Sequence, residues 1–267
     1  MTELVLVLSD SFIPLKSPDI DPQFKSIIMP NKVQYVLCLG NVINQETFDW
    51  LNGLSSNLII VRGDYDINKN YPEKKSIKIG NFQIGMIHGH QIMPLGDLDS
   101  LSNIQRELDC DILLYGHTHK LNIVTKDNKL FLNPGSITGA LSPLMEDCFP
   151  SFMILALQDN EVIIYSYVLS DRSKKFEVGH VEYIKGSNEL KVIQKVSIEN
   201  IEEENEENEE DEKINNEEKN DVEKKEEEKT NNEKENNTQE ENIQDNNDKK
   251  VIENEKEDTE EKKNKDE

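Results

Sequence analysis

Short apolar segments that end on polar residues recur through the first half of the chain, and they constrain its fold more than any other feature. Four of them span residues 4–8, 33–39, 58–61 and 82–87, and an Asp, Asn or His follows each within three residues. Runs this short and this rich in Val, Ile and Leu are typical of strands buried in a parallel sheet. Ligands bind at the carboxyl edge of such sheets, so we expect these polar side chains to form a site there.

Four of the five histidines lie in two short pairs, at residues 88–90 and 117–119. Positions i and i+2 of an extended segment face the same way, so each pair can direct two imidazoles at one point. Histidine is the commonest side-chain metal ligand. One pair alone fits loop histidines bonded to backbone equally well, but two pairs together with the acidic motifs favour a metal site.

The order of the patterns predicts two kinds of sheet. Apolar residues at helical spacing in segments 45–51 and 97–108 separate strand patterns, which predicts crossover helices between parallel strands. In the second half, Asp127-Asn128 and Asp159-Asn160 each separate two strand patterns, which predicts two hairpins, and residues 176–184 predict a last strand. A parallel half and an antiparallel half suit two packed sheets flanked by helices.

The charge of the chain is concentrated at its C-terminal end. Residues 199–267 hold 31 acidic and 12 basic residues, a net charge of −19, whereas residues 1–198 hold 23 acidic and 18 basic residues, a net of −5. The segment 199–267 has no aromatic residue, so we expect a disordered tail, with a long solvated helix as the alternative. We expect a folded domain over 1–186 and a linker over 187–198. Nucleic acid is a poor partner for so acidic a chain.

The cysteines and the hydropathy pattern predict a cytosolic protein. Cys38, Cys110 and Cys148 have no ligand spacing, and the first two lie in or beside apolar runs, which predicts buried thiols in a reducing compartment. No run approaches the roughly 18 apolar residues of a membrane span. We therefore expect any membrane association to come through partners.

The motifs occur in a characteristic order, which is Asp10, Gly40-Asn41, Gly63-Asp64-Tyr65-Asp66, His88-Gly89-His90, Gly116-His117-Thr118-His119 and Asn133-Pro134-Gly135-Ser136. Over roughly residues 1–186 this set resembles the calcineurin-like metallophosphoesterases and, within them, the branch that forms the small subunit of the retromer coat. The resemblance implies an α/β fold with a four-layer α/β/β/α sandwich. It also implies descent from enzymes in which two divalent ions polarise a phosphate and activate a hydroxide.

The resemblance implies six metal-ligand positions, which are Asp10, Asn41, Asp64, His88, His117 and His119. It also shows where the chain departs from active enzymes. Phe12 stands at the position of a histidine ligand and has no donor atom. Asn41 replaces the bridging aspartate, and Tyr65 replaces the histidine that protonates the leaving group. A tyrosine with a pKa near 10 is a poor acid at neutral pH, and loss of a general acid typically slows a reaction by about 10²–10⁴.

These departures predict no catalytic residue and at most one weakly bound divalent ion. The donors expected to hold it are Asn41, Asp64, His88 and His117. Mixed nitrogen and oxygen donors suit Zn²⁺, Mn²⁺ and Mg²⁺ alike. We therefore expect a non-catalytic scaffold. A working divalent-metal-dependent phosphodiesterase and an unrelated metal-binding module are the alternatives.

The resemblance also implies partners. It predicts that the metal-site edge docks on the large α-solenoid subunit of retromer, in retrograde endosome-to-Golgi transport, and that regulatory proteins bind a separate hydrophobic patch. The positions that match this patch are Ile27, Ile28, Met93, Ile154, Tyr165 and Tyr167. Ordinary packing between sheet and helix is the alternative for each apolar cluster.

Overall fold

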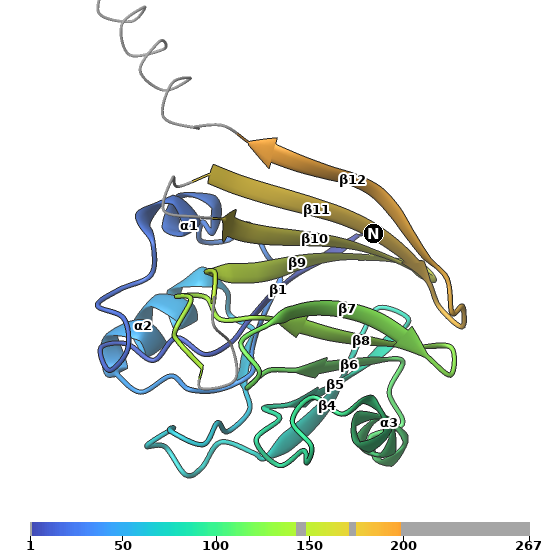
Figure 1. Cartoon of the computed structure of the whole chain (residues 1–267), viewed down its shortest axis with the longest axis horizontal. Helices are drawn as coiled ribbons and strands as arrows, with labels where there is room; N and C mark the ends of the chain where they lie inside the picture. The colour runs from blue at the N-terminus through green and yellow to red at the C-terminus, as the bar shows by residue number, and fades with distance from the viewer. Residues whose placement is uncertain (1, 143–147, 171–174, 199–267) are drawn as a thin grey trace, which may run out of the picture. The chain divides into compact units, whose positions relative to one another are not determined.

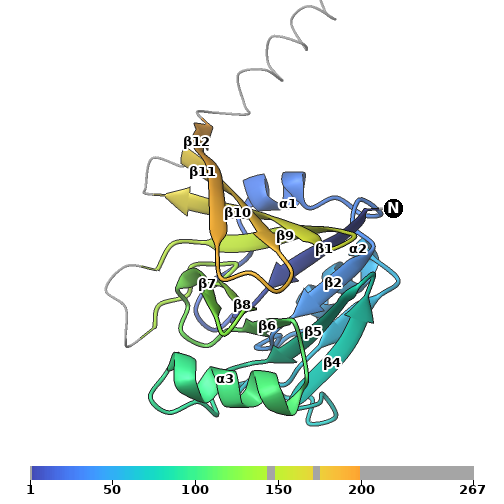
Figure 2. The same cartoon turned by 90° about the vertical axis from the view of Figure 1, so that its right-hand side faces the viewer.

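The computed structural model describes residues 2–142, 148–170 and 175–198, which all lie in one compact unit, Met1–Asn200. The predicted tail, residues 199–267, lies outside the described residues. The elements, drawn in Figures 1 and 2, are β1 (Glu3–Leu8), α1 (Pro22–Ile27), β2 (Tyr35–Cys38), α2 (Gln45–Leu54), β3 (Leu58–Ile60), β4 (Lys74–Ile79), β5 (Phe82–Ile87), α3 (Leu98–Glu107), β6 (Ile112–Tyr115), β7 (Leu121–Lys126), β8 (Lys129–Pro134), β9 (Ser151–Gln158), β10 (Glu161–Ser170), β11 (Lys175–Ile184) and β12 (Leu190–Ile198).

The strands form two mixed sheets. The seven-stranded sheet has the order β12-β11-β10-β9-β1-β2-β3, and the five-stranded sheet has the order β4-β5-β6-β8-β7. Strands β1, β2 and β3 are parallel, as are β5, β6 and β8, while β9 to β12 are antiparallel. The predicted division between a parallel and an antiparallel half is therefore too simple, because each sheet contains both pairings.

Three apolar clusters show that the layers are those predicted. The largest lies between the two sheets and includes Val7, Leu37 and Met86. A second includes Phe24 of α1 and Leu51 of α2, and a third lies under α3. Figures 1 and 2 show α1 and α3 on opposite outer sides of the paired sheets. The predicted four-layer α/β/β/α sandwich is confirmed.

The predicted hairpins are also confirmed, and their turns explain why. Asp127 and Asn128 both have positive φ, of 51° and 58°, and join β7 to β8. Positive φ at both turn positions is the geometry that matches the twist of paired strands, and Asp and Asn tolerate it better than most residues.

The predicted thiols Cys38 and Cys110 are buried, and burial raises the pKa of Cys110 to about 11.

The prediction of a linker over 187–198 is wrong, because β12 lies within it and pairs with β11. Its residues alternate too irregularly to predict a strand, and the register shifts between His180 and Val181. Leu190 packs against the core between the sheets. The sequence pattern also does not predict the edge strand β4. Its three lysines, which are typical of protected sheet edges, interrupt the apolar pattern by which a strand is recognised.

Within the described residues, we find no helix long and apolar enough to cross a membrane.

We predict that β12 contributes to the stability of the folded unit. A chain that ends after Gly186 loses β12 and leaves the edge of β11 unpaired, which we expect to cost about 2 kcal/mol through lost burial and hydrogen bonds. In a unit of this size the melting temperature should fall by about 4–8 °C. The matched control is a chain that ends after Asn200, which should have the same melting temperature as the full chain. Equal melting temperatures for the two truncated chains would contradict the prediction.

Candidate metal centre

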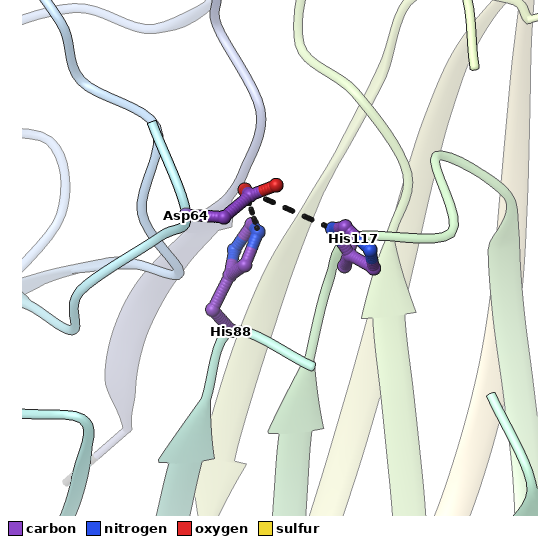
Figure 3. A group of neighbouring side chains, drawn as sticks. All are labelled: Asp64, His88 and His117. Atoms are coloured by element: carbon purple, nitrogen blue, oxygen red, sulfur yellow. Dashed lines mark hydrogen bonds and ion pairs between the residues drawn. The ribbon is translucent and has the colours of Figure 1, made fainter. Parts of the chain in front are cut away.

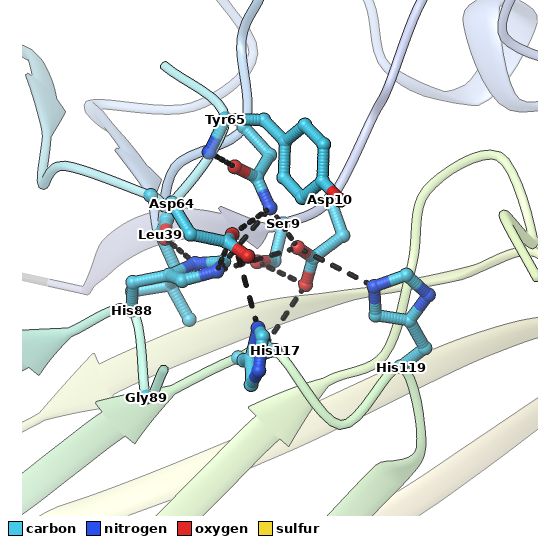
Figure 4. A network of polar contacts seen from close by, with 12 residues as sticks. Ser9, Asp10, Leu39, Asp64, Tyr65, His88, Gly89, His117 and His119 are labelled. Carbon is cyan, nitrogen blue, oxygen red and sulfur yellow. Dashed lines mark hydrogen bonds and ion pairs between the residues drawn. The ribbon is translucent and has the colours of Figure 1, made fainter. Parts of the chain in front are cut away.

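The candidate ligands follow five strands drawn from both sheets. Asp10 comes after β1, Asn41 after β2, Asp64 after β3, His88 after β5, and His117 and His119 after β6. Figure 4 shows Asp10, Asp64, His88, His117 and His119 converging at the carboxyl edge, as the sequence predicts, and the Asn41 amide bonds to Asp10 and Asp64 there. The meeting of the two sheets at this edge brings donors from distant parts of the chain into one polar network.

The loops at this edge have an unusual backbone. Positive φ values occur at Asp10 (57°), Phe12 (47°), Asn41 (63°), His117 (66°) and His119 (59°). Residues other than glycine seldom adopt this conformation, and when they do they cluster at functional sites.

Two glycines let these loops approach one another. A Cβ atom added to Gly63 would lie 2.3 Å from Asn41 Oδ1, and one added to Gly116 would lie 2.4 Å from Ser9 Oγ. Both distances are shorter than contacts between non-bonded atoms. A side chain at either position would therefore displace the network.

The amide of Asn41 lies at the middle of the network. Its Nδ2 donates to Asp10 Oδ1 at 2.8 Å and to Asp64 Oδ1 at 3.1 Å, and it lies 3.2 Å from His88 Nε2. Its Oδ1 accepts from the backbone N–H of Tyr65 at 3.0 Å. The nitrogen thus faces the centre. The carbonyl oxygen, the atom of an amide that can bind a cation, is held on the other side by the Tyr65 N–H.

Asp10 is fully buried and its oxygens are occupied. It accepts from Ser9 Oγ at 2.7 Å and from the backbone N–H of His117 at 3.0 Å, and His119 Nε2 lies 3.6 Å away. Burial opposes ionisation, but the charge of His88 and the contacts of His119 and Ser9 outweigh it and lower the pKa of Asp10 to about 2. Asp10 is therefore a carboxylate held by internal donors.

Among the described residues, Asp64, His88 and His117 form the group whose donor atoms lie close enough to hold one ion, all within 4.8 Å of one another (Figure 3). Asp64 Oδ1 lies 3.1 Å from His88 Nε2 and 3.8 Å from His117 Nδ1. The Leu39 carbonyl, 2.6 Å from His88 Nδ1, accepts a hydrogen bond from that nitrogen, which leaves Nε2 facing the group. One carboxylate and two imidazoles fit Zn²⁺, Mn²⁺ or Mg²⁺ and leave a coordination position open.

The pKa values in this group depend on its mutual contacts. Burial raises the pKa of Asp64, but hydrogen bonds with His88 and Asn41 lower it by more than burial raises it. The net shift of the Asp64 pKa is therefore downward. Burial and the charge of His88 lower the pKa of His117, which keeps it neutral and available as a ligand. Burial lowers the pKa of His88, but Asp10 and Asp64 overcome this effect and raise it. A proton therefore competes with a cation for His88 Nε2.

The side of the centre nearer Phe12 is different. The phenyl ring of Phe12 is buried, with its centroid 5.1 Å from the Tyr65 ring and 5.5 Å from the His119 ring. The ammonium of Lys16 lies 4.1 Å from the Phe12 centroid, within range of a cation–π contact. An apolar ring and a protein cation thus stand beside Asp10 and His119, which lie outside the three-donor group.

Two positioning residues were not predicted. Asp66 is buried and accepts from the backbone N–H groups of Gly63 (2.6 Å), Asn41 (2.9 Å) and Val42 (2.7 Å), so it ties together the loops after β2 and β3. Asn133 donates to Thr118 Oγ1 at 2.9 Å and so holds the loop after β6. Both lie inside motifs that the sequence displays. Their place in these motifs indicates that they belong to the site, but their positioning roles depend on which groups they contact in the folded structure.

The six positions predicted as one hydrophobic patch do not form one surface. Ile27, Ile154 and Tyr167 are partly buried and pack on the cluster beneath α1 and α2, and Tyr165 pairs with Ile154 across β9 and β10. Ile28, only 4% exposed, is a core residue.

Met93, by contrast, lies in the loop between β5 and α3, where its carbonyl accepts from Ser100 Oγ at 3.5 Å. It is 75% exposed, on the loop that follows His88. Met93 thus lies on a loop of the five-stranded sheet, whereas Ile154 and Tyr165 lie on β9 and β10 of the seven-stranded sheet.

The two mixed sheets and the Asp/His centre at their joint edge are those of a calcineurin-like phosphoesterase, and the model of the calcineurin-like phosphoesterase superfamily domain matches residues 4–160. A curated relative, vacuolar protein sorting-associated protein 29 of Schizosaccharomyces pombe, is 36% identical over 178 residues, which cover 65% of this chain and 95% of that protein. The chain therefore belongs to the vacuolar protein sorting-associated protein 29 (Vps29) family within that superfamily.

Solved structures agree. Vps29 from Cryptosporidium parvum has 44% sequence identity and a TM-score of 0.66, and the match covers 69% of this chain and 99% of that one. Wild-type Vps29 from Entamoeba histolytica, in complex with Zn²⁺, has 42% identity and a TM-score of 0.61, with 73% and 98% covered.

We predict one Zn²⁺ site in the folded unit. Calorimetric titration of the chain ending after Asn200 should give a stoichiometry of one. His117→Ala should weaken Zn²⁺ binding by at least about 10–100-fold, the loss typical even of an outer-shell partner. Affinity should rise from pH 6 to pH 8, because the raised pKa of His88 means that a proton competes with the ion. Two sites of similar affinity, or an affinity independent of pH, would contradict this prediction.

Proposed function

We propose that the chain is the small, non-catalytic subunit of the retromer coat, and that it docks on the large α-solenoid subunit. The docking surface is the loop edge that carries the candidate metal centre. In this role the protein acts in retrograde endosome-to-Golgi transport, and it is cytoplasmic and peripheral on endosomal membranes through the complex. Membership of the Vps29 family supports this proposal.

One observation carries the proposal, which is that large apolar side chains are exposed on the same loops as the candidate ligands. They are Leu15, Tyr65, Ile67 and Met93. Ile67 is 76% exposed and Met93 is 75% exposed. Exposed apolar residues that gather at one edge mark a protein-binding surface. A small-molecule site would instead bury such side chains in a concave pocket.

The polar centre supports a scaffold more than an enzyme. Superfamily chemistry needs two ions, which activate a hydroxide and polarise a phosphate. Here Phe12 and the inward amide nitrogen of Asn41 stand on the side of the first ion, and Tyr65 takes the position of the acid. The three donors Asp64, His88 and His117 favour the second candidate, a divalent-metal-dependent phosphodiesterase of low activity.

A second surface is proposed for regulatory proteins. Ile27, Ile154, Tyr165 and Tyr167 lie along the outer face of the seven-stranded sheet and α1. Tyr167 stacks on Phe152, with ring centroids 4.7 Å apart. Rigid tyrosines with an apolar body and a polar tip suit an interface. This surface belongs to a different layer from the docking edge, so a regulator and the large subunit can bind together.

We predict that a charge on the docking edge abolishes assembly. Ile67→Asp and Met93→Asp should each weaken binding of the large subunit at least about tenfold, the effect expected at an interface hot spot, without changing the melting temperature. Val192→Asp is a matched control, because Val192 is 71% exposed but lies on β12. Ile154→Asp should retain binding of the large subunit and lose binding of regulatory proteins. An equal loss of affinity for the large subunit in Ile67→Asp and Val192→Asp would refute the assigned docking surface.

We also predict no metal-dependent turnover above a disabled variant. Hydrolysis of an aryl phosphodiester with Mn²⁺ at neutral pH should be the same for the native chain and for Asp64→Ala/His88→Ala, which loses two of the three donors. Turnover in the native chain alone would favour the phosphodiesterase over the scaffold.

A further inference from the structure

The side-chain amide of Asn41 joins the candidate metal centre to the docking edge. Its Nδ2 faces Asp64 Oδ1 and His88 Nε2, at 3.1 and 3.2 Å, and its Oδ1 accepts from the Tyr65 N–H at 3.0 Å. Tyr65 is half exposed, and its ring packs edge-on against Phe12. The two ends of one amide therefore contact the two surfaces of functional interest.

This orientation is incompatible with a cation held by the three donors. Asp64 Oδ1 and His88 Nε2 are donor atoms of that group, and the same atoms now contact the Asn41 amide nitrogen. A cation would take their lone pairs and would face the positive N–H groups of the amide. Amide oxygen and nitrogen have nearly the same size, so a half turn about the Cβ–Cγ bond exchanges them without new steric contacts.

The backbone of Asn41 is held by bonds that are separate from those of its side-chain amide. Asp66 Oδ2 accepts from the Asn41 N–H at 2.9 Å, and Asp66 Oδ1 accepts from the Val42 N–H at 2.7 Å. The backbone bonds to Asp66 do not involve the amide. A turn of the amide therefore leaves the backbone bonds of the loop after β2 in place. It changes what Tyr65 and the centre contact, and it also removes the hydrogen bond from Nδ2 to Asp10 Oδ1.

We propose that Asn41 is a cation-responsive switch that reports occupation of the centre to Tyr65. Without a cation, the amide nitrogen bonds the carboxylates and the oxygen bonds the Tyr65 N–H. When Asp64, His88 and His117 hold a cation, the amide turns, its oxygen becomes a further donor, and the Tyr65 N–H loses its acceptor. The backbone at Tyr65, on the exposed apolar edge, is then released. The switch does not depend on which partner binds that edge.

Amide hydrogen exchange of the full-length chain, followed by NMR with EDTA and then with saturating Zn²⁺, tests this proposal. A bound ligand normally slows exchange. Here the Tyr65 amide should exchange about tenfold faster with Zn²⁺, the change expected for loss of one hydrogen bond. The Asn41 and Val42 amides, bonded to Asp66, should not accelerate. A Tyr65 amide whose exchange is unchanged or slowed by Zn²⁺ in the native chain would overturn the proposal.

Two variants separate the switch from other effects of the ion. Asn41→Asp presents oxygen on both sides, so Zn²⁺ should bind at least as tightly while the Tyr65 amide stays protected. His117→Ala should remove the Zn²⁺ effect at Tyr65, which excludes ions bound elsewhere on this acidic chain. Acceleration at Tyr65 that persists in His117→Ala would also overturn the proposal. Both readouts are independent of assembly, so a failure of docking would leave them unchanged.

Discussion

The packing of the two sheets against each other is the interaction on which the rest of the structure depends. Val7, Leu37, Met86 and Leu114 are fully buried between the sheets, on four of the strands that end at the candidate centre. Burying a side chain of this size contributes about 1.5–3 kcal/mol. The packing fixes the carboxyl edge of one sheet beside that of the other, so donors about one hundred residues apart, such as Asp10 and His117, share a network.

Within that network, buried polar groups are satisfied by one another. An unpaired buried charge is costly, so each carboxylate needs donors. Asn41 donates to Asp10 and Asp64, and Asp66 accepts three backbone N–H groups. The protein itself supplies the compensation that two cations supply in active members of the superfamily. A site built this way retains the geometry of its loops, which the proposed docking edge requires.

The location of the apolar surfaces follows from the layers. Loops at the carboxyl edge carry Ile67 and Met93 into solvent, whereas Ile154 and Tyr167 lie on the outer face of the seven-stranded sheet. Because the two surfaces belong to different parts of the sandwich, binding at one need not disturb the other. This separation suits a subunit that attaches to a large partner and still offers a surface to regulators.

The sequence alone determined the sandwich, the carboxyl-edge location of the site and the hairpins, because strand patterns, glycines and turn residues act locally. It also identified Asp64, His88 and His117 by their motifs. Only the tertiary structure decided that Asn41 faces the centre with its nitrogen, since that depends on the N–H of Tyr65, 24 residues away. It likewise decided that Met93 is exposed on a loop of the other sheet and that β12 extends the seven-stranded sheet. These outcomes depend on partners distant in the chain, which no local pattern encodes.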